Sequence, residues 1–137
     1  MNISARCEYA CRAAVELGLR HGAQTTMTSQ DIAERRSIPE KYLVHILLQL
    51  KRSGIVRSVR GAQGGYLLAR PPEDVRLLDI VEAIDGPTLD PLPVDDPHSD
   101  ALKRAWEEVA DRIRAVLAET TVRNLMEKAS NIDMYYI

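Results

Sequence analysis

The spacing of apolar residues predicts three helices in the first part of the chain. Residues 4–20 carry alanine and leucine at the spacing i, i+3, i+4 and i+7, which is one face of an amphipathic helix, and Ser4 is a suitable N-cap. A short helix follows, opened at Thr28 by the capping-box-like TSQD. The motif SIPE at residues 37–40 opens a third helix, with Pro39 in its first turn, where the missing N–H costs nothing. Two short helices joined by a tight connection predict a helix-turn-helix.

After a glycine at residue 54 the period changes to that of strands. Two apolar runs, residues 55–59 and 66–68, flank the glycine-rich turn 61–65 and predict a β-hairpin. Since a hairpin directly after a helix-turn-helix makes a winged helix, the predicted fold is mainly α with a small β-hairpin wing. The alternative is a hairpin that only packs on the core and reverses the chain. The wing is favoured because the hairpin carries donors suited to phosphates and base edges. These donors are Arg57, Arg60 and Gln63.

The C-terminal part of the chain predicts a helix that packs against another helix. It follows a short apolar helix over residues 77–84 and a linker, residues 87–100, that contains four prolines. Apolar residues then recur at spacings of four, three, four and three, which makes a narrow stripe on one helix face. The stripe consists of Leu102, Trp106, Val109, Ile113 and Val116.

We interpret this apolar stripe as the contact with the same helix of a second subunit, because the linker sets it apart. The alternative is packing on its own domain. A two-fold homodimer would place two recognition helices about one DNA turn, roughly 34 Å, apart. The apolar tail NIDMYYI is expected to pack back on the domain. The predicted units are a winged helix-turn-helix DNA-binding domain over 1–86, the linker 87–100, and a dimerisation helix with its tail over 101–137.

Length and composition predict one soluble globular domain. The chain has 137 residues, of which 45% are hydrophobic and 28% charged. It has no apolar run near the roughly 18 residues of a membrane span, and its first residues lack the pattern of a signal peptide. We therefore expect a cytoplasmic protein without a membrane partner. The two cysteines, Cys7 and Cys11, are too few for a disulfide scaffold.

The net charge of −2 conceals a strong separation of charge along the chain. Residues 34–60 hold seven basic side chains and two acidic ones, whereas residues 71–111 hold three basic and twelve acidic side chains. A basic segment of this kind is the electrostatic footprint of a nucleic-acid-binding surface. We therefore expect double-stranded DNA as a partner.

The sequence offers little support for an enzyme. It has no paired carboxylate site, no phosphate-binding GxxxxGK[ST] motif, and the glycines of the expected wing do not precede a helix as in a dinucleotide fingerprint. Two alternatives to a DNA-binding regulator remain open: a winged-helix module for protein–protein interaction, and a redox or metal sensor using Cys7 and Cys11. These cysteines lie four residues apart on one helix face, where buried, inert thiols are the favoured interpretation.

Two long segments carry a resemblance to a known family. ISARCEYACRAAVELGL, followed by TSQDIAERRSIPEKYLVHILLQLKRSGIVRSVRGAQGGYLLARPPEDVRLLDIVEAIDGP, resembles the Rrf2 family of bacterial winged-helix transcription regulators. That family includes an iron-sulfur cluster regulator, a nitric-oxide-sensing repressor and a cysteine-metabolism repressor. The resemblance covers nearly the whole chain and is most specific in SVRGAQGGYLLARPPE. It implies a dimeric DNA-binding regulator, which we expect to be a repressor, with a long C-terminal helix that crosses its partner.

The resemblance also implies how the chain contacts DNA. The recognition helix, about residues 39–53, would enter the major groove, and the wing, residues 57–66, would enter the minor groove with Arg60 and Gly61. Arginine suits a narrow, electronegative minor groove. The recognition-helix contacts would be Pro39, Glu40, Lys41, Tyr42 and Val44. The remaining candidate contacts are Thr28, Ser29, Gln30, His45, Arg57 and Gln63.

One departure from the family pattern bears on cofactors. Family members that sense iron or nitric oxide carry three cysteines between the helix after the wing and the long helix, because thiolates hold iron-sulfur clusters. The matching segment here, PTLDPLPVDDPHSDA, has none. We therefore expect no conventional iron-sulfur cluster and no other metal site. The effector stays open among a small molecule, a protein partner and a thiol change at Cys7 or Cys11.

Overall fold

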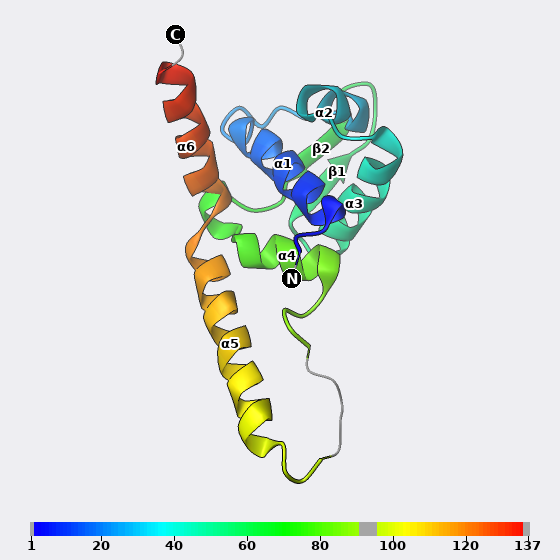
Figure 1. Cartoon of the computed structure of the whole chain (residues 1–137). Helices are drawn as coiled ribbons and strands as arrows, with labels where there is room; N and C mark the ends of the chain where they lie inside the picture. The colour runs from blue at the N-terminus through cyan, green and yellow to red at the C-terminus, as the bar shows by residue number, and fades with distance from the viewer. Residues whose placement is uncertain (1, 91–95, 136–137) are drawn as a thin grey trace.

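The helices and the hairpin follow one another in the predicted order. A computed structural model of the chain describes residues 2–90 and 96–135, with side chains through residue 129. The elements in these ranges are α1 (Ala5–Leu19), α2 (Ser29–Arg36), α3 (Glu40–Arg52), β1 (Val56–Val59), β2 (Gly65–Leu68), the 3-10 helix η1 (Pro72–Asp74), α4 (Leu77–Asp85), α5 (Asp100–Glu119) and α6 (Val122–Tyr135) (Figure 1). The predicted fold class, mainly α with a small β-hairpin, is confirmed.

One core joins the first four helices and the hairpin. The face of α1 that meets the other helices consists of small residues, since Ala10, Ala13 and Ala14 are completely buried. Small side chains let neighbouring elements approach α1 closely, and larger aliphatic groups fill the space around it. The largest completely or almost completely buried side chains are Leu17, Ile32, Leu43, Ile46, Leu47, Leu50, Ile55 and Ile80. They come from every helix of this unit, so burial of this core orients α1, α2, α3 and α4 together.

Two of the three predicted N-caps are confirmed. The Ser4 hydroxyl accepts a hydrogen bond from the backbone N–H of Cys7 at 3.0 Å, and Thr28 accepts one from the backbone N–H of Asp31 at 3.1 Å. These bonds satisfy N–H groups that the first turn of a helix leaves without a partner.

The third predicted cap is wrong. Ser37 does not open α3 but ends α2, in the left-handed conformation with φ 54°, and its N–H bonds to the carbonyl of Ala33. The N-cap of α3 is Pro39, which makes no side-chain capping bond. A left-handed residue reverses the chain within one position, so the turn between the two helices is too short to hold a separate capping box.

The C-terminal segment contains two helices where the sequence predicted one helix and a tail. The chain leaves α5 at Thr120, which is extended, and starts α6 after Thr121. The Thr121 N–H donates to the side chain of Asn124 at 2.9 Å, and the Asn124 N–H donates to the Thr121 hydroxyl at 3.2 Å. This reciprocal capping starts a new helix instead of extending the first. The packing predicted for the tail, residues 131–137, lies outside the residues whose side chains are described.

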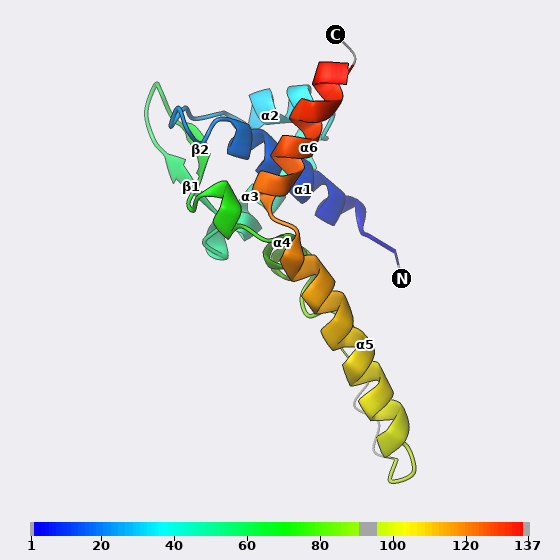
Figure 2. The ribbon, with the colours of Figure 1, turned by 90° about the vertical axis from the view of Figure 1, so that its left-hand side faces the viewer.

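The junction between α5 and α6 is attached to the segment that precedes α4. The N–H of Leu77 donates to the carbonyl of Thr120, and the N–H of Val122 donates to the carbonyl of Val75, each at 2.8 Å. Val122 is almost completely buried. From this point α6 runs beside α1, as both views show (Figures 1 and 2). The junction therefore holds one end of α5 against the domain.

The rest of α5 projects from the domain as an arm. Figures 1 and 2 show the helix extending away from the other elements, and none of its residues is buried.

In the described part of the chain, no helix is both long enough and apolar enough to cross a membrane.

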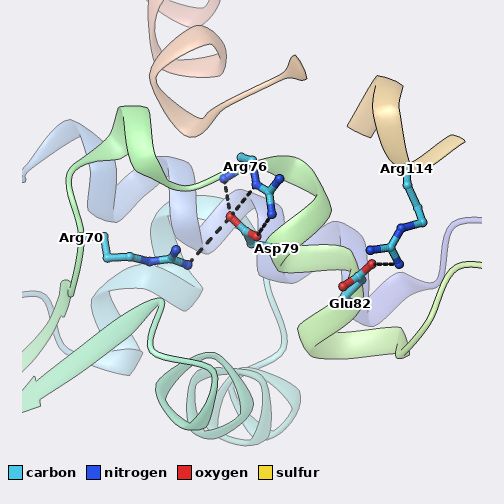
Figure 3. A network of polar contacts seen from close by, with 5 residues as sticks. All are labelled: Arg70, Arg76, Asp79, Glu82 and Arg114. Carbon is cyan, nitrogen blue, oxygen red and sulfur yellow. Dashed lines mark hydrogen bonds and ion pairs between the residues drawn. The ribbon is translucent and has the colours of Figure 1, made fainter. Parts of the chain in front are cut away.

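Acidic side chains of α4 connect the hairpin side of the domain to this arm. In Figure 3 the Asp79 carboxylate lies between the guanidinium groups of Arg76 and Arg70, and Glu82 pairs with Arg114 of α5. The shortest distance from a carboxylate oxygen of Asp79 to a guanidinium nitrogen is 2.9 Å for Arg76 and 3.9 Å for Arg70. The Asp79 carboxylate also accepts a bond from the Arg76 backbone N–H at 2.9 Å, at the start of α4. Burial opposes ionisation of Asp79, but the bonds from Arg76 and the nearby arginine charges outweigh it and hold the pKa of Asp79 below its ordinary value.

The contact between α1 and α6 requires a residue without a side chain at Gly18. A Cβ at this position would lie 2.8 Å from Cγ1 of Val122 and 2.8 Å from the sulfur of Met126. We therefore expect Gly18→Leu to lower the free energy of unfolding by about 1–3 kcal/mol, the usual cost of overpacking, although leucine is a better helix former than glycine.

Denaturant unfolding at fixed protein concentration measures this change, with Gly22→Leu as the control. Nothing lies within 4 Å of a Cβ at Gly22, so that variant should stay within about 0.5 kcal/mol of the parent. A Gly18→Leu protein as stable as the parent would contradict the packing described for α6.

Candidate DNA-binding surface

The exposed face of α3 carries most of the predicted recognition-helix residues. Its opposite face is anchored by Leu43, Ile46, Leu47 and Leu50, all completely buried. Helical geometry then directs the intervening positions to solvent. The predicted contacts Pro39, Glu40, Lys41, Tyr42, Val44 and His45 are all exposed. Within this set the Lys41 ammonium lies 5.1 Å from the centre of the Tyr42 ring.

The start of α2 supplies the second group of predicted residues. Thr28 and Gln30 are exposed and Ser29 is half-buried. The Thr28 oxygen accepts the capping bond from Asp31, which leaves its hydroxyl proton available as a donor. The free N–H groups and the positive dipole end of a helix favour a phosphate oxygen at this place.

The hairpin forms the predicted antiparallel pair and its turn stands out from the domain. Val56 pairs with Leu68 and Val59 with Gly65, which fixes the register of the two strands. Beyond the pair the chain turns at Gly61, where φ is +106°, a conformation that favours glycine. Figure 2 shows the loop extending beyond the helices at the left of the domain. The predicted wing residues Arg57, Arg60, Gly61 and Gln63 are all exposed.

The turn end of the hairpin is held by the loop before α2. Tyr66 and Met27 exchange two backbone hydrogen bonds, of 2.7 Å and 3.1 Å, and the Thr26 hydroxyl donates to the carbonyl of Gln63 at 2.8 Å. A Cβ on Gly65 would lie 2.5 Å from the carbonyl oxygen of Met27, so the approach requires glycine there. The start of β2 and the end of the turn are therefore fixed to the loop that precedes α2.

Sequence reasoning missed two residues of this arrangement. Thr26 supports the turn, and the side chain of Gln24 accepts a hydrogen bond from Arg57 at 3.4 Å. The run TTMT at residues 25–28 contained a signal, since successive β-branched residues are typical of an extended segment that pairs with a strand.

The basic segment divides into structural and exposed charges. Arg35 and Arg36 each lie 3.8 Å from the buried carboxylate of Glu16, which also pairs with Arg20 at 3.6 Å. These pairs join the ends of α1 and α2. The other five basic side chains of residues 34–60 form no ion pair with any described residue. They are Lys41, Lys51, Arg52, Arg57 and Arg60, which lie on α3 and the hairpin.

The two cysteines lie away from this surface, inside α1. Cys7 is buried and Cys11 half-buried, and neither forms a disulfide. A hydrogen bond with Cys7, together with burial, raises the pKa of the Cys11 thiol and keeps it protonated. Among the residues that the structure describes, no three His, Cys, Asp or Glu side chains are grouped so that they could hold a metal ion.

The predicted dimerisation residues share one exposed face of the α5 arm. Leu102, Trp106, Val109 and Val116 are between 40% and 63% exposed, and Ile113 is half-buried. The structure brings these five residues together on one helix, remote from the hairpin (Figure 2).

Comparison with known proteins places this architecture in a family. Residues 3–128 match the Rrf2 family model, described as an iron-dependent transcriptional regulator. The regulator CymR of Bacillus subtilis is 32% identical over 125 residues, which cover 91% of this chain and 89% of CymR. Such relatives are transcriptional regulators and not enzymes, as the sequence predicted.

Solved structures agree with this assignment. The structure of CymR, the global cysteine regulator of B. subtilis, aligns with a TM-score of 0.80 at 29% identity and covers 93% of this chain and 98% of CymR. IscR of T. potens aligns with a TM-score of 0.77 at 32% identity, over 94% of this chain and 88% of that protein. With a helix-turn-helix, an attached basic hairpin and a projecting helical arm, the chain belongs to the Rrf2 family of DNA-binding transcription regulators.

Proposed function

We propose that the protein is a homodimeric, sequence-specific repressor that inserts α3 into the major groove and the hairpin into an adjacent minor groove. The observation that carries this proposal is the set of five basic side chains on α3 and the hairpin that have no ion-pair partner among the described residues, in a chain whose net charge is −2. A dimer bound at a promoter occupies DNA that RNA polymerase requires, which is why we propose repression. The protein would act in the cytoplasm, where bacterial DNA lies.

The residues of this surface suit different parts of the duplex. The ammonium of Lys41 and the N-terminus of α2, with Thr28, Ser29 and Gln30, suit phosphate oxygens. Val44 and His45 lie on the exposed face of α3, where they would meet base edges or the flanking backbone. Arg60 precedes the turn at Gly61, whose backbone can follow a narrow groove because no Cβ obstructs it. Arg57 and Gln63 supply further donors beside that turn.

The α5 arm supports a two-fold dimer. A helix that exposes an apolar stripe along its length gains stability when it buries that stripe against a partner helix. Its remaining faces are charged, which suits them to water on the outside of a helix pair. A two-fold axis through the arms would present two α3 helices to successive turns of the DNA, roughly 34 Å apart.

We also propose that the protein works without a conventional iron-sulfur cluster. Such clusters are held by several thiolates, and this chain has only Cys7 and Cys11, both on α1 and within the domain. The donor set therefore does not fit the cofactor. The switch that controls DNA binding would then be a small molecule, a protein partner or a change of the two thiols.

Removal of a predicted DNA-binding side chain should weaken binding and lower its dependence on salt. We expect Lys41→Ala and Arg60→Ala each to weaken binding to a promoter duplex. A plot of the logarithm of the binding constant against the logarithm of the salt concentration should also become less steep, by about one, wherever the replaced side chain neutralised a phosphate. Fluorescence anisotropy at several salt concentrations measures both effects. Arg123→Ala is the control, since Arg123 lies on α6 and pairs with Glu73 at 3.3 Å. If both variants bound as tightly as the parent at moderate salt, the interaction surface would belong to a protein partner instead.

A charge in the apolar stripe should separate the dimer. Trp106 is 51% exposed, so Trp106→Glu should leave the protomer folded but bury a carboxylate at the contact between arms. We expect a shift from dimer to monomer in sedimentation velocity, with loss of high-affinity DNA binding. Glu108→Ala is the control, because Glu108 lies outside the apolar stripe of α5 and pairs with Arg112 at 2.8 Å. A dimeric Trp106→Glu protein would show that the stripe is not the contact.

Protein purified without oxygen should contain no stoichiometric cluster. We expect iron and acid-labile sulfide well below one per protomer and no visible charge-transfer absorption, because two thiols supply too few ligands. Iron analysis and an absorption spectrum of the same sample measure this. A full complement of cluster in the parent protein would refute the proposal that it works without one. If that cluster survived in Cys7→Ala, Cys7 would also be shown not to be a required ligand.

A further inference from the structure

Eight of the ten exposed large apolar side chains in the described part of the chain lie on two surfaces, and the other two, Ile3 and Leu19, lie at the two ends of α1. Four of them, Leu102, Trp106, Val109 and Val116, lie on the α5 arm, where a partner helix would cover them. Three more, Tyr42, Val44 and Leu48, lie on α3, and Val59 lies on the adjoining strand β1. The second group therefore occupies the surface that carries the unpaired basic side chains.

Two of these side chains form a separate apolar strip on α3. Val44 and Leu48 are 47% and 42% exposed and lie four residues apart, so their side chains are neighbours on one face. They point away from the completely buried residues Leu43 and Leu47. Neither Val44 nor Leu48 belongs to the core, and a β-branched valine on an exposed helix face is a poorer helix former than alanine or lysine. Helix propensity therefore does not explain the valine at position 44.

The surroundings of Val44 favour DNA as the group that covers it. Lys41 and His45 lie on the same exposed face, and Lys51 and Arg52 are exposed at the end of the helix. The cations of this helix, Lys41, Lys51 and Arg52, outnumber its one acid, Glu40, and complement a polyanion whose interior presents an apolar group. In the major groove that group is the C5-methyl of thymine, because the other groups at the base edges there are hydrogen-bond donors and acceptors.

We propose that Val44 is a specificity-determining residue that reads a thymine methyl group in each half-site of the DNA target. This inference rests on the proposed function, because it requires α3 to lie in the major groove. Val44 is the fifth residue of α3, within the N-terminal part of a recognition helix that contacts base edges. Tyr42 is engaged with the Lys41 ammonium, and Leu48 lies one turn farther along the helix, so Val44 is the apolar side chain placed to select a base.

The test removes single methyl groups from DNA. The parent protein first selects its duplex from a random-sequence pool, and each thymine of that duplex is then replaced by deoxyuridine, which lacks only the C5-methyl. Binding of the parent, Val44→Ala and Leu48→Ala is measured by anisotropy at one salt concentration. Both substitutions introduce a good helix former at an exposed position, so the variants should fold like the parent.

We expect one thymine in each half-site at which methyl removal weakens binding of the parent about fourfold, the factor that corresponds to about 0.8 kcal/mol for one buried carbon group. Val44→Ala, which lacks two of the methyl carbons that would contact the thymine methyl, should discriminate less than the parent between the thymine and deoxyuridine duplexes at that position. Leu48→Ala should keep the fourfold difference there, which separates the role of Val44 from a general loss of apolar surface.

Two results would overturn the inference. In one, the parent binds its selected duplex but tolerates deoxyuridine at every position. In the other, Val44→Ala retains the same methyl dependence as the parent. If the pool yields no selected duplex at all, the proposed DNA-binding function fails, and the role of Val44 fails with it.

Discussion

The burial of one face of α3 determines which side chains the protein offers to DNA. Leu43, Ile46, Leu47 and Leu50 have no exposed surface, and rotation of the helix would bring several of them into water. Each such side chain contributes roughly 1.5–3 kcal/mol of burial, so together they hold the helix in one orientation. The exposed face, from Lys41 to His45, therefore keeps a fixed direction relative to the rest of the domain.

The hairpin is attached to that same domain at its turn end. The backbone bonds between Tyr66 and Met27, and the bond from Thr26 to Gln63, join the wing to the loop that precedes α2. Because α2 and α3 are packed on the same core, these bonds fix the hairpin relative to α3.

The arm is connected to this unit through α4. Asp79 contacts Arg70, just after β2, and Glu82 contacts Arg114 on α5, so one helix touches both the hairpin side of the domain and the arm (Figure 3). The backbone bonds of Leu77 and Val122 attach this same, C-terminal end of the arm to the segment before α4. The position of the arm relative to α3 and the hairpin thus depends on α4.

The sequence by itself determined the features that depend on near neighbours. Caps at Ser4 and Thr28, the buried positions of α3 and the hairpin around Gly61–Gly65 follow from local hydrogen bonding and from the period of apolar residues. Only the tertiary structure decided the rest: the role of Ser37, the break at Thr120, the pairing of Tyr66 with Met27, and the use of Arg35 and Arg36 by the buried Glu16. Each of these involves partners brought together by folding or a choice between competing hydrogen bonds. A local sequence pattern does not say which distant residue will lie beside a given polar group in the folded chain. Folding selects the partners, because it favours the arrangement that leaves the fewest buried polar groups unpaired.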